Sequence, residues 1–378
     1  MPKSGKDKER GKKKADPVLC IAWFLAAASA LAVHPDASYA GYIDWRSLGI
    51  LWSLMVVIQG LRENAVFEKI GSAVTRRVSN IRQLAGALIF LCFFGSMFVT
   101  NDVALLTFVP LSIILFHSCG KDASVSWLVI LQTIAANLGS MLTPIGNPQN
   151  LYLFGLMQAP IGTFVLWMLP YTLVTAVLLL IAILLFPGGK EKAILGGNSA
   201  TVRHFGSRKQ IGVYLALFVF AMLTVLRLVP WQFTAGCTLI VVFGMDFKIL
   251  KRADYTLLLT FIGFFIFTGN MARIPAVRDA LQQLVQNREF PVAVLTSQVI
   301  SNVPAALLLS DFAADHHELL LGVNVGGLGT MIASMASLIS YKFYADSYPD
   351  EKVRYLLRFT LLNLAMLAIL AGLHFLLN

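Results

Sequence analysis

Hydrophobic residues fill long, continuous runs along this chain, and short polar or charged stretches separate the runs. The runs do not alternate between apolar and polar positions as half-buried strands do, and a membrane-spanning helix needs about 20 apolar residues. The pattern therefore predicts an all-α polytopic membrane protein. The predicted apolar segments are 18–33, 46–60, 83–99, 103–117, 124–157, 163–186, 210–228, 231–247, 254–269, 290–310, 317–345 and 352–377.

The composition narrows the class of protein in the same direction. Of the 378 residues, 57% are hydrophobic and 13% are charged, and the mean hydropathy is +0.73. Soluble domains carry about 25% charged residues, so a soluble enzyme, a disordered chain and a fibrous protein are excluded. The strands of a membrane β-barrel are alternating segments of about ten residues, which these continuous runs do not resemble.

The N-terminus combines a basic segment with the first apolar run. Seven Lys and Arg residues lie within the first fourteen, and Ser38-Tyr39-Ala40 follows the run at the place of a signal-peptide cleavage site. We interpret the run as an uncleaved first transmembrane helix, because the basic segment is long; a cleaved signal peptide is the alternative. In both cases the basic end stays in the cytoplasm.

The positions of the basic residues predict the topology. If 83–117 and 290–310 do not cross the membrane, while 124–157 and 317–345 cross once each, cytoplasmic segments hold 25 of the 30 Lys and Arg residues. This asymmetry agrees with the positive-inside rule and predicts a plasma-membrane protein with its N-terminus inside and its C-terminus outside. The rule also explains the net charge of +10, so no nucleic-acid partner is expected.

Two apolar segments are each divided by a short polar motif. Segment 83–117 is apolar on both sides of Thr100–Asp102, and segment 290–310 is interrupted at Ser301–Pro304. Non-helical backbone at membrane depth must be surrounded by protein or by a water-filled cavity. Each segment is therefore predicted to be a re-entrant helical hairpin whose tip carries the polar motif.

Two other segments, 124–157 and 317–345, are too long for one straight span of about 20 residues. Gly139–Asn150 interrupts the first with Gly, Pro and Asn, and Gly329–Ser340 interrupts the second with small hydroxylated residues. Gly and Pro end helices and free backbone groups, so each segment is predicted to be a broken transmembrane helix. Freed carbonyls and hydroxyls suit a sodium ion, whereas the N-termini of half-helices suit an anion.

The two halves of the chain resemble each other. Thr100–Leu106 matches Ser301–Leu307, and Asn137–Leu142 matches Gly327–Ile332. An odd number of predicted crossings separates the two units, so they have opposite orientations, as in the inverted repeats of secondary transporters. The predicted organisation is a basic N-terminus at 1–17, a first helix and outer loop at 18–43, repeat 1 at 44–186, a cytoplasmic linker at 187–209, connecting helices at 210–253 and repeat 2 at 254–377.

Asp102 is the one carboxylate within a predicted intramembrane interruption. A charge at that depth is costly and indicates a function, which for Asp102 would be the binding of a cation or a proton. The alternative is that it caps the following half-helix. The matching position is Val303, so the role is not shared by the two halves. For Ser140, Ser334 and Ser337 the alternative to ligand binding is close packing of helices.

Other chemistry-bearing residues are interpreted more simply. A group in the predicted loop before 317–345 is expected to be a solvated turn and not a metal site, namely Asp311, Asp315, His316, His317 and Glu318. His117 and His374 lie near predicted helix ends and are expected to be interfacial. No P-loop and no intramembrane metal or Ser–His set is evident, so neither ATP-driven transport nor an enzyme is predicted. No cofactor is expected beyond a coupling sodium ion.

Leu142–Asn150, together with the Thr100–Asp102 tip, resembles the ion transporter superfamily. The nearest branches are the divalent anion/sodium symporters, the citrate-transporter-like permeases and the arsenite-permease-like proteins. The resemblance extends from about Asp44 to Tyr344. It implies a homodimer in the lipid bilayer and an elevator-like movement of the part that carries the substrate.

In the symporter branch each hairpin tip carries Ser-Asn-Thr, which contacts a substrate carboxylate and helps to form a sodium site with the neighbouring break. By position, the resemblance implies substrate contacts at the tip residues Thr100, Asn101, Asp102, Ser301, Asn302 and Val303. The polar residues of the breaks add the candidate substrate contacts Thr143, Pro144, Asn147, Ser334 and Ser337. The candidate sodium ligands at the tips and breaks are Asn101, Gly139, Ser140, Gly146, Asn302, Gly329 and Thr330. The third tip residue departs from this pattern in both halves.

Together these features predict a secondary active transporter of a small anion, a di- or tricarboxylate, that is coupled to sodium or protons and works by alternating access. The alternative within the same superfamily is a sodium/proton antiporter that uses Asp102 as the exchanging carboxylate. A channel is disfavoured because inverted repeats with broken helices are typical of alternating access.

Overall fold

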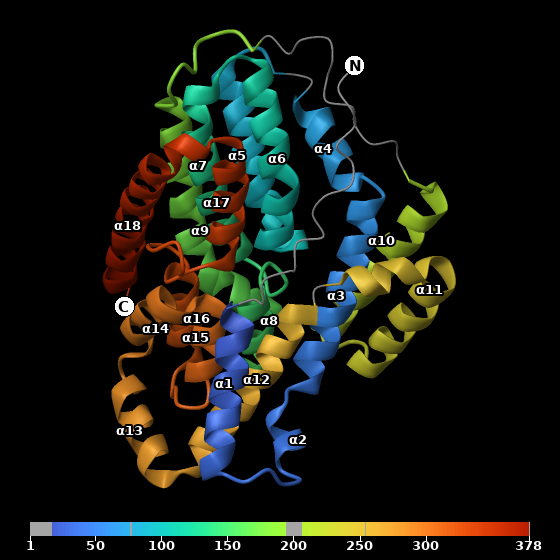
Figure 1. The fold of residues 1–378 in the computed structure, drawn as a ribbon, viewed down its shortest axis with the longest axis vertical. Helices are drawn as coiled ribbons and strands as arrows, with labels where there is room; N and C mark the ends of the chain where they lie inside the picture. Colours follow the sequence, from blue (N-terminus) through green and yellow to red (C-terminus); the bar gives the residue numbers. More distant parts are fainter. Residues whose placement is uncertain (1–16, 76–77, 194–205, 254, 378) are drawn as a thin grey trace.

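The computed structural model describes residues 17–75, 78–193, 206–253 and 255–377 (Figure 1). These residues form helices and no β-strand. The helices are α1 Pro17–Ala32, α2 Tyr39–Tyr42, α3 Trp45–Glu63, α4 Val66–Thr75, α5 Ile81–Val99, α6 Asn101–Ser118, α7 Asp122–Ser140, α8 Pro148–Met157, α9 Ile161–Leu184, α10 Arg208–Val225, α11 Trp231–Arg252, α12 Tyr255–Arg273, α13 Pro275–Val285, α14 Glu289–Ile300, α15 Asn302–Leu309, α16 His316–Val325, α17 Met335–Ser347, the 3₁₀ turn η1 Pro349–Glu351 and α18 Lys352–Leu377. The predicted basic N-terminus and the larger part of the predicted linker lie outside the described residues.

The helices have the lengths and compositions of membrane spans. In the part of the chain that the structure describes, eight helices are long and apolar enough to cross a membrane. The pair α3–α4, bent by 60° at a short break, adds a ninth if it is counted as one span. The prediction of an all-α polytopic membrane protein is therefore confirmed.

Both predicted hairpins are helix–tip–helix units. The tip Thr100 separates α5 from α6, and the tip Ser301 separates α14 from α15. The first hairpin is longer than its apolar run, because the Asn80 side chain accepts the N–H of Gln83 and starts α5 before the run begins. With 19 and 18 residues, α5 and α6 are each long enough to cross a membrane, so re-entry on one side stays a prediction.

Both long segments are divided, but the second break lies earlier than the predicted Gly329–Ser340, because α17 begins at Met335 and holds Ser337 and Ser340 in regular helix. The break in the first lies between Ser140, the last residue of α7, and Pro148, the first residue of α8. The break in the second lies between Val325 at the end of α16 and Met335 at the start of α17. Asn147 caps α8 by accepting the N–H of Asn150, and proline at the first helical position suits a helix start.

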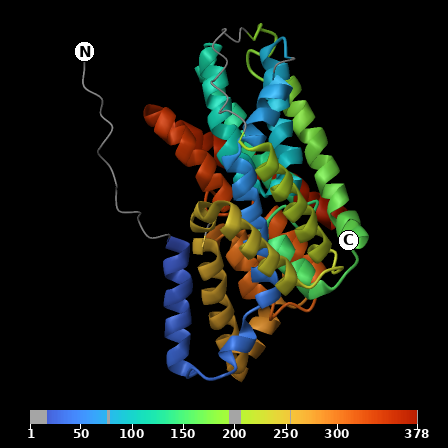
Figure 2. The same ribbon diagram turned by 90° about the vertical axis from the view of Figure 1, so that its right-hand side faces the viewer.

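Packing contacts of α8 and α17 join the set of helices α5, α6 and α7 to the set α14, α15 and α16. Helix α3 packs against α10 and α11, and α1 packs along α12, where it lies at one edge of the molecule (Figure 2). The hairpin α5–α6 packs with α7 in the upper half of Figure 1, and α14, α15 and α16 pack together below its middle. The most enclosed candidate span is α7, and 89% of it is buried. The tips and breaks lie where these units meet.

Candidate functional site

The two hairpin tips have the same backbone conformation. Thr100 has φ 75° and ψ 150°, and Ser301 has φ 78° and ψ 155°. In each tip the next residue is an asparagine, and its side-chain oxygen accepts the N–H of the residue that follows it, at 3.0 Å for both Asn101 and Asn302. The tips therefore begin their second helices in one common way, although their sequences diverge after the asparagine.

Each tip also contacts the break of its own half. The backbone N–H of Asn101 donates to the carbonyl of Gly146 at 3.1 Å, and that of Asn302 donates to the carbonyl of Ala333 at 2.9 Å. Only glycine fits at Gly146, because an added Cβ would lie 2.0 Å from the carbonyl oxygen of Ser140. The predicted proximity of tip and break is thus present in both halves.

A second contact between hairpin and break recurs as well. The hydroxyl of Thr143 donates to the carbonyl of Met97, and the hydroxyl of Thr330 donates to the carbonyl of Gln298 at 3.2 Å. Gln298 also accepts the N–H of Thr330, a contact that needs the φ of +100° at Gly329. Two of the predicted sodium ligands, Gly329 and Thr330, therefore hold the second break against its hairpin.

The two halves meet in a buried set of amides and hydroxyls. The amide of Asn147, which caps α8, donates to the side-chain oxygen of Asn324 at 3.1 Å. The hydroxyl of Ser334, at the start of α17, donates to the side-chain oxygen of Asn137 at 3.0 Å. Each half-helix start thus bonds to the asparagine that precedes the break in the other half. We call the following residues the central cluster: Asn101, Asn137, Asn147, Asn150, Asn324, Ser334 and Ser337.

The two sides of the central cluster differ in how completely their side chains are hydrogen-bonded. The Nδ2 group of Asn324 donates to Asn150 Oδ1 at 2.7 Å. The matching atoms on the other side are Asn137 Nδ2 and the hydroxyl of Ser337. Asn137 corresponds to Asn324 because each lies nine residues before the carbonyl that accepts the tip N–H, at Gly146 and Ala333. Both of these atoms are buried without a hydrogen-bond partner. Buried polar groups are nearly always paired, so this side offers unused hydrogen-bonding capacity for a ligand.

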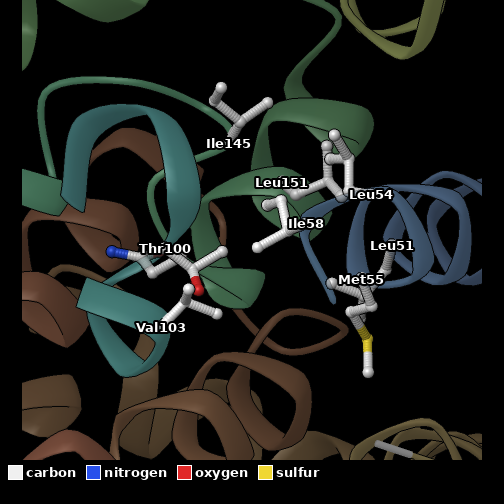
Figure 3. A pocket seen from close by; sticks show the side chains of 9 residues that line it. Leu51, Leu54, Met55, Ile58, Thr100, Val103, Ile145 and Leu151 are labelled. Atoms are coloured by element: carbon white, nitrogen blue, oxygen red, sulfur yellow. The ribbon is translucent and has the colours of Figure 1, made fainter. Parts of the chain in front are cut away.

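A small cavity adjoins the cluster on the side of α3 (Figure 3). Its volume is about 30 Å³, enough for a water molecule but far below the roughly 300–1,000 Å³ of pockets that hold small organic ligands. The tip and the first break form one wall and apolar side chains of α3 form the other. The lining residues are Leu51, Leu54, Met55, Ile58, Thr100, Val103, Ile145, Asn147 and Leu151.

The remaining predicted site residues lie around the cluster in different roles. Asp102 is half-buried in the first turn of α6. Ser140 donates to the carbonyl of Asn137 and accepts from the Asn147 amide, so it supports the cluster. Gly139 packs α7 against α5, because an added Cβ would lie 2.2 Å from the carbonyl oxygen of Phe93.

The last two predicted residues, Pro144 and Val303, are buried. Sequence reasoning missed Asn137, Asn150 and Asn324 as site residues. For Asn137 and Asn324 the available signal was an asparagine inside an otherwise apolar helical run, which needs a partner at membrane depth, and Asn150 ended the polar break that the sequence already marked.

Comparison with known proteins places the chain among transporters. The sequence profile described as Citrate transporter matches residues 14–336. The chain is 31% identical to the inner membrane protein YbiR of Escherichia coli over 318 residues, which is 82% of each chain. It is 30% identical to an uncharacterized transporter of Methanocaldococcus jannaschii over 301 residues, 79% of this chain and 81% of the relative. A 46 kDa membrane protein of Mycobacterium leprae is 23% identical over 338 residues.

Proposed function

The chain belongs to the citrate transporter family, and we propose that it is a secondary transporter of a small anion, a di- or tricarboxylate, coupled to sodium ions or protons. The family and the eight candidate spans make it a multi-pass membrane transporter. The nature of the anion, the coupling ion and the alternating-access cycle are the proposal.

The observation that carries this proposal is the convergence of helix ends on the central cluster. Four helices, α6, α8, α15 and α17, begin at the tips and breaks, and four others, α5, α7, α14 and α16, end there. Helix N-termini carry partial positive charge and unpaired N–H groups, which favour an anion. Helix C-termini present carbonyl oxygens, which favour a cation. This arrangement of helix ends supports the proposal that an anion and its coupling cation bind side by side.

The unpaired atoms of the central cluster support an oxygen-bearing anion. Asn137 Nδ2 is a donor, and the Ser337 hydroxyl donates equally well, so both suit a carboxylate oxygen. A buried donor without an acceptor costs free energy, and a ligand that supplies the acceptor recovers it. We place one substrate carboxylate between these two side chains.

The charge of the site segments supports coupling to a cation. The tips and breaks, 99–104, 137–150, 300–305 and 324–340, contain no Lys or Arg, and Asp102 adds a negative charge. A bound di- or tricarboxylate therefore meets no basic side chain from these segments. Because an uncompensated charge at membrane depth is costly, this composition supports the entry of sodium ions or protons together with the anion.

The reciprocal bonds of the cluster support a movement of both halves together. Asn147 bonds to Asn324 and Ser334 to Asn137, so separating the halves would break buried hydrogen bonds. The wall formed by α3 contributes only apolar side chains to the cavity (Figure 3). Sliding of the site past α3 costs fewer polar contacts than opening it between the halves. We therefore propose an elevator-like cycle in which α3, α10 and α11 stay fixed.

The test is uptake of labelled citrate, succinate and related carboxylates into proteoliposomes under imposed sodium or pH gradients. We expect gradient-dependent uptake that Asn101→Ala and Asn302→Ala each reduce at least tenfold. Asn363→Ala is the matched control, since Asn363 is also fully buried but donates within α18. Sodium/proton exchange that needs no carboxylate and is lost in Asp102→Asn would overturn the proposal in favour of the antiporter.

A further inference from the structure

A second buried polar cluster lies outside the tips and breaks and joins three helices. His374, near the end of α18, places Nε2 3.2 Å from Oε2 of Glu318 in the first turn of α16. Its Nδ1 lies 3.1 Å from the hydroxyl of Tyr171 on α9. The expectation that Glu318 belongs to a solvated turn is therefore wrong, since it lies in α16, whereas the interfacial position of His374 stays a prediction. The turn ends at Asp315, whose side chain accepts two N–H groups and starts α16.

The surroundings of this pair are apolar and aromatic. The His374 side chain is 5% exposed, and its ring stacks on Phe290 of α14 with centroids 3.7 Å apart and planes 7° apart. The ring of His317 lies against Trp167 of α9, with centroids 4.6 Å apart and the planes tilted by 37°. Glu318 retains 24% exposure, so the pair is enclosed on the His374 side and open to protons on the Glu318 side.

Among the described residues, charged and titratable side chains of α16 and α14 lie near the pair. His317 and Asp315 come from α16 and its cap, and Glu289 comes from the start of α14. Glu289 is 3% exposed and accepts the N–H groups of Ala314 and Asp315, so its carboxylate is held by the backbone. Helix α9 contains no charged residue, and α18 contains none after Arg358 apart from His374 itself. Helix α16 contains no Lys or Arg, and Arg288, the N-cap residue of α14, stands directly before Glu289.

Burial restricts the protonation states that such a pair adopts. With no proton the pair carries charge −1, and with two protons it carries +1, and both charges are costly in an apolar site. With one proton the pair is neutral overall, whether the proton lies on the carboxylate or on the imidazole. The enclosed pair thus favours one bound proton and releases it only when water reaches it at low proton concentration.

The pair is connected to the central cluster through α16. Glu318 and Asn324 are six residues apart on this helix, a distance of about 9 Å along its axis. Asn324 in turn bonds to Asn147 and Asn150 in the other half. A proton on the pair therefore travels with the helix that contributes to the substrate site.

We propose that Glu318 and His374 form the proton-binding site that couples transport to the pH gradient, with Tyr171 orienting the imidazole. This inference rests on the proposed function, because it assumes that α16 moves with a bound anion. One proton is taken from water on the acidic side, crosses on the pair while the site is closed, and is returned to water on the other side.

Two readouts separate this inference from the proposed function. The first is exchange of labelled for unlabelled carboxylate at equal pH on both sides, which needs no net proton movement. The second is accumulation of the same carboxylate driven by a pH gradient. We expect Glu318→Gln and His374→Gln to retain exchange within threefold and to lose accumulation at least tenfold. His117→Gln is the matched control, because His117 also faces a carboxylate, Asp122, but its side chain is 76% exposed.

A third readout requires no transport. The melting temperature of the purified protein is measured from pH 5 to pH 8 for the wild type, Glu318→Gln, His374→Gln and Tyr171→Phe. We expect the carboxylate and imidazole variants to change the pH dependence by one proton, and Tyr171→Phe to shift it without removing it. Parallel curves for wild type and His374→Gln, or full pH-driven accumulation in Glu318→Gln, would overturn the inference. Absence of carboxylate exchange in the wild type, with non-parallel melting curves, would overturn the proposed function and leave the proton site standing.

Discussion

At the scale of single residues, the hairpin tips hold a backbone conformation that side chains disfavour. Thr100 and Ser301 combine a φ near 75° with a ψ near 150°, a region that is populated almost only by glycine. Such residues persist when the surrounding structure holds them, and they gather at functional sites. Both tips have a hydroxylated residue where glycine would adopt the conformation without strain, so we expect the hydroxyl to have a role of its own.

Replacing a tip residue by glycine should separate stability from function. We expect Ser301→Gly to raise the free energy of unfolding by about 1 kcal/mol, because the backbone strain is relieved, and to weaken carboxylate binding, because the hydroxyl is lost. Thermal unfolding with and without ligand measures both effects. Ser297→Gly is the control, since Ser297 lies in regular α14 and glycine there costs stability. A lower melting temperature for Ser301→Gly would show that no strain is stored.

The unpaired hydroxyl of Ser337 leads to a second expectation. Ser337→Ala should leave the melting temperature of the ligand-free protein unchanged or slightly higher, because it removes a buried group that bonds to nothing. The same change should reduce the stabilisation by carboxylate, with an affinity loss of about tenfold, or ~1.4 kcal/mol. Ser340→Ala removes a hydrogen bond to the carbonyl of Ala336, one turn earlier in α17, and should instead lower stability alone. Equal ligand responses in the two variants would argue against the site.

The hydrogen bonds also correct the sequence alignment of the two halves at one residue. The sequence match pairs Asn137 with Gly327, because a Leu-Gly pair follows each of them. The hydrogen bonds pair it with Asn324, three residues earlier, since both lie nine residues before the carbonyl that accepts the tip N–H. Glycines dominate a comparison of short motifs. The hydrogen bond between the halves depends instead on the position of the asparagine along the helix before the break, which the folded structure shows.

At the scale of elements, the C-terminal ends of α1 and α12 are joined by one charged group. Arg273, the last residue of α12, donates to the Asp36 carboxylate at 2.8 Å, to Ser38 and to Tyr42. Asp36 lies outside the helices, and its pKa is below the ordinary 3.8 because the Ser38 hydroxyl and then Arg273 hydrogen-bond to the carboxylate. This group fixes the segment between α1 and α3 to the second half of the molecule.

Because the pKa of Asp36 is lowered, the stabilisation by the Asp36–Arg273 contact depends on pH in a defined range. A carboxyl with a depressed folded-state pKa stabilises the fold above its unfolded pKa and loses this effect as the pH falls through the folded value. We expect Arg273→Gln to lower the melting temperature modestly and by a constant amount at pH 7 and pH 5, and by less below pH 4. Arg278→Gln, whose partner is its sequence neighbour Asp279, is the control. An undiminished difference at pH 3 would contradict this account.

Elements were more predictable than their ends. The apolar runs placed the hairpins and the two broken helices, because helix interruption by Gly, Pro and polar residues is a local property. The starts of α5 and α6 were not predicted, since capping by Asn80 starts α5 before its apolar run and the Thr100 tip starts α6 at Asn101. The partners of His374 were not predictable either, because Glu318 and Tyr171 lie on other helices that only tertiary packing brings together.

At the scale of the whole molecule, the distribution of Lys and Arg sets the expected orientation in the membrane. Gly41, between α1 and α3, belongs to the predicted outer side, and Ser347, at the end of α17, belongs to the predicted cytoplasmic side. Both are exposed, and an added Cβ at Gly41 meets no atom within 4 Å. The two positions therefore report on opposite faces without disturbing the fold.

Labelling with a membrane-impermeant maleimide tests this orientation. In a background with Cys20, Cys92, Cys119 and Cys237 replaced, we expect Gly41→Cys to react in intact cells and Ser347→Cys to react only after permeabilisation. The parent protein without cysteine is the control for background labelling. The reverse pattern would invert the topology, and equal labelling of both positions would place the two loops on one side.

The bonds between the halves also have a consequence for biosynthesis. Asn147 and its partner Asn324 are separated by 177 residues. At a synthesis rate of about 5–20 residues per second, the first half waits about 9 to 35 seconds before its partner has been made. During that time its amides lie in a half-built membrane domain without their final acceptors. Nascent chains that pause in this interval should be the ones that quality-control proteases recognise, and faster completion of the second half should raise the yield of folded protein.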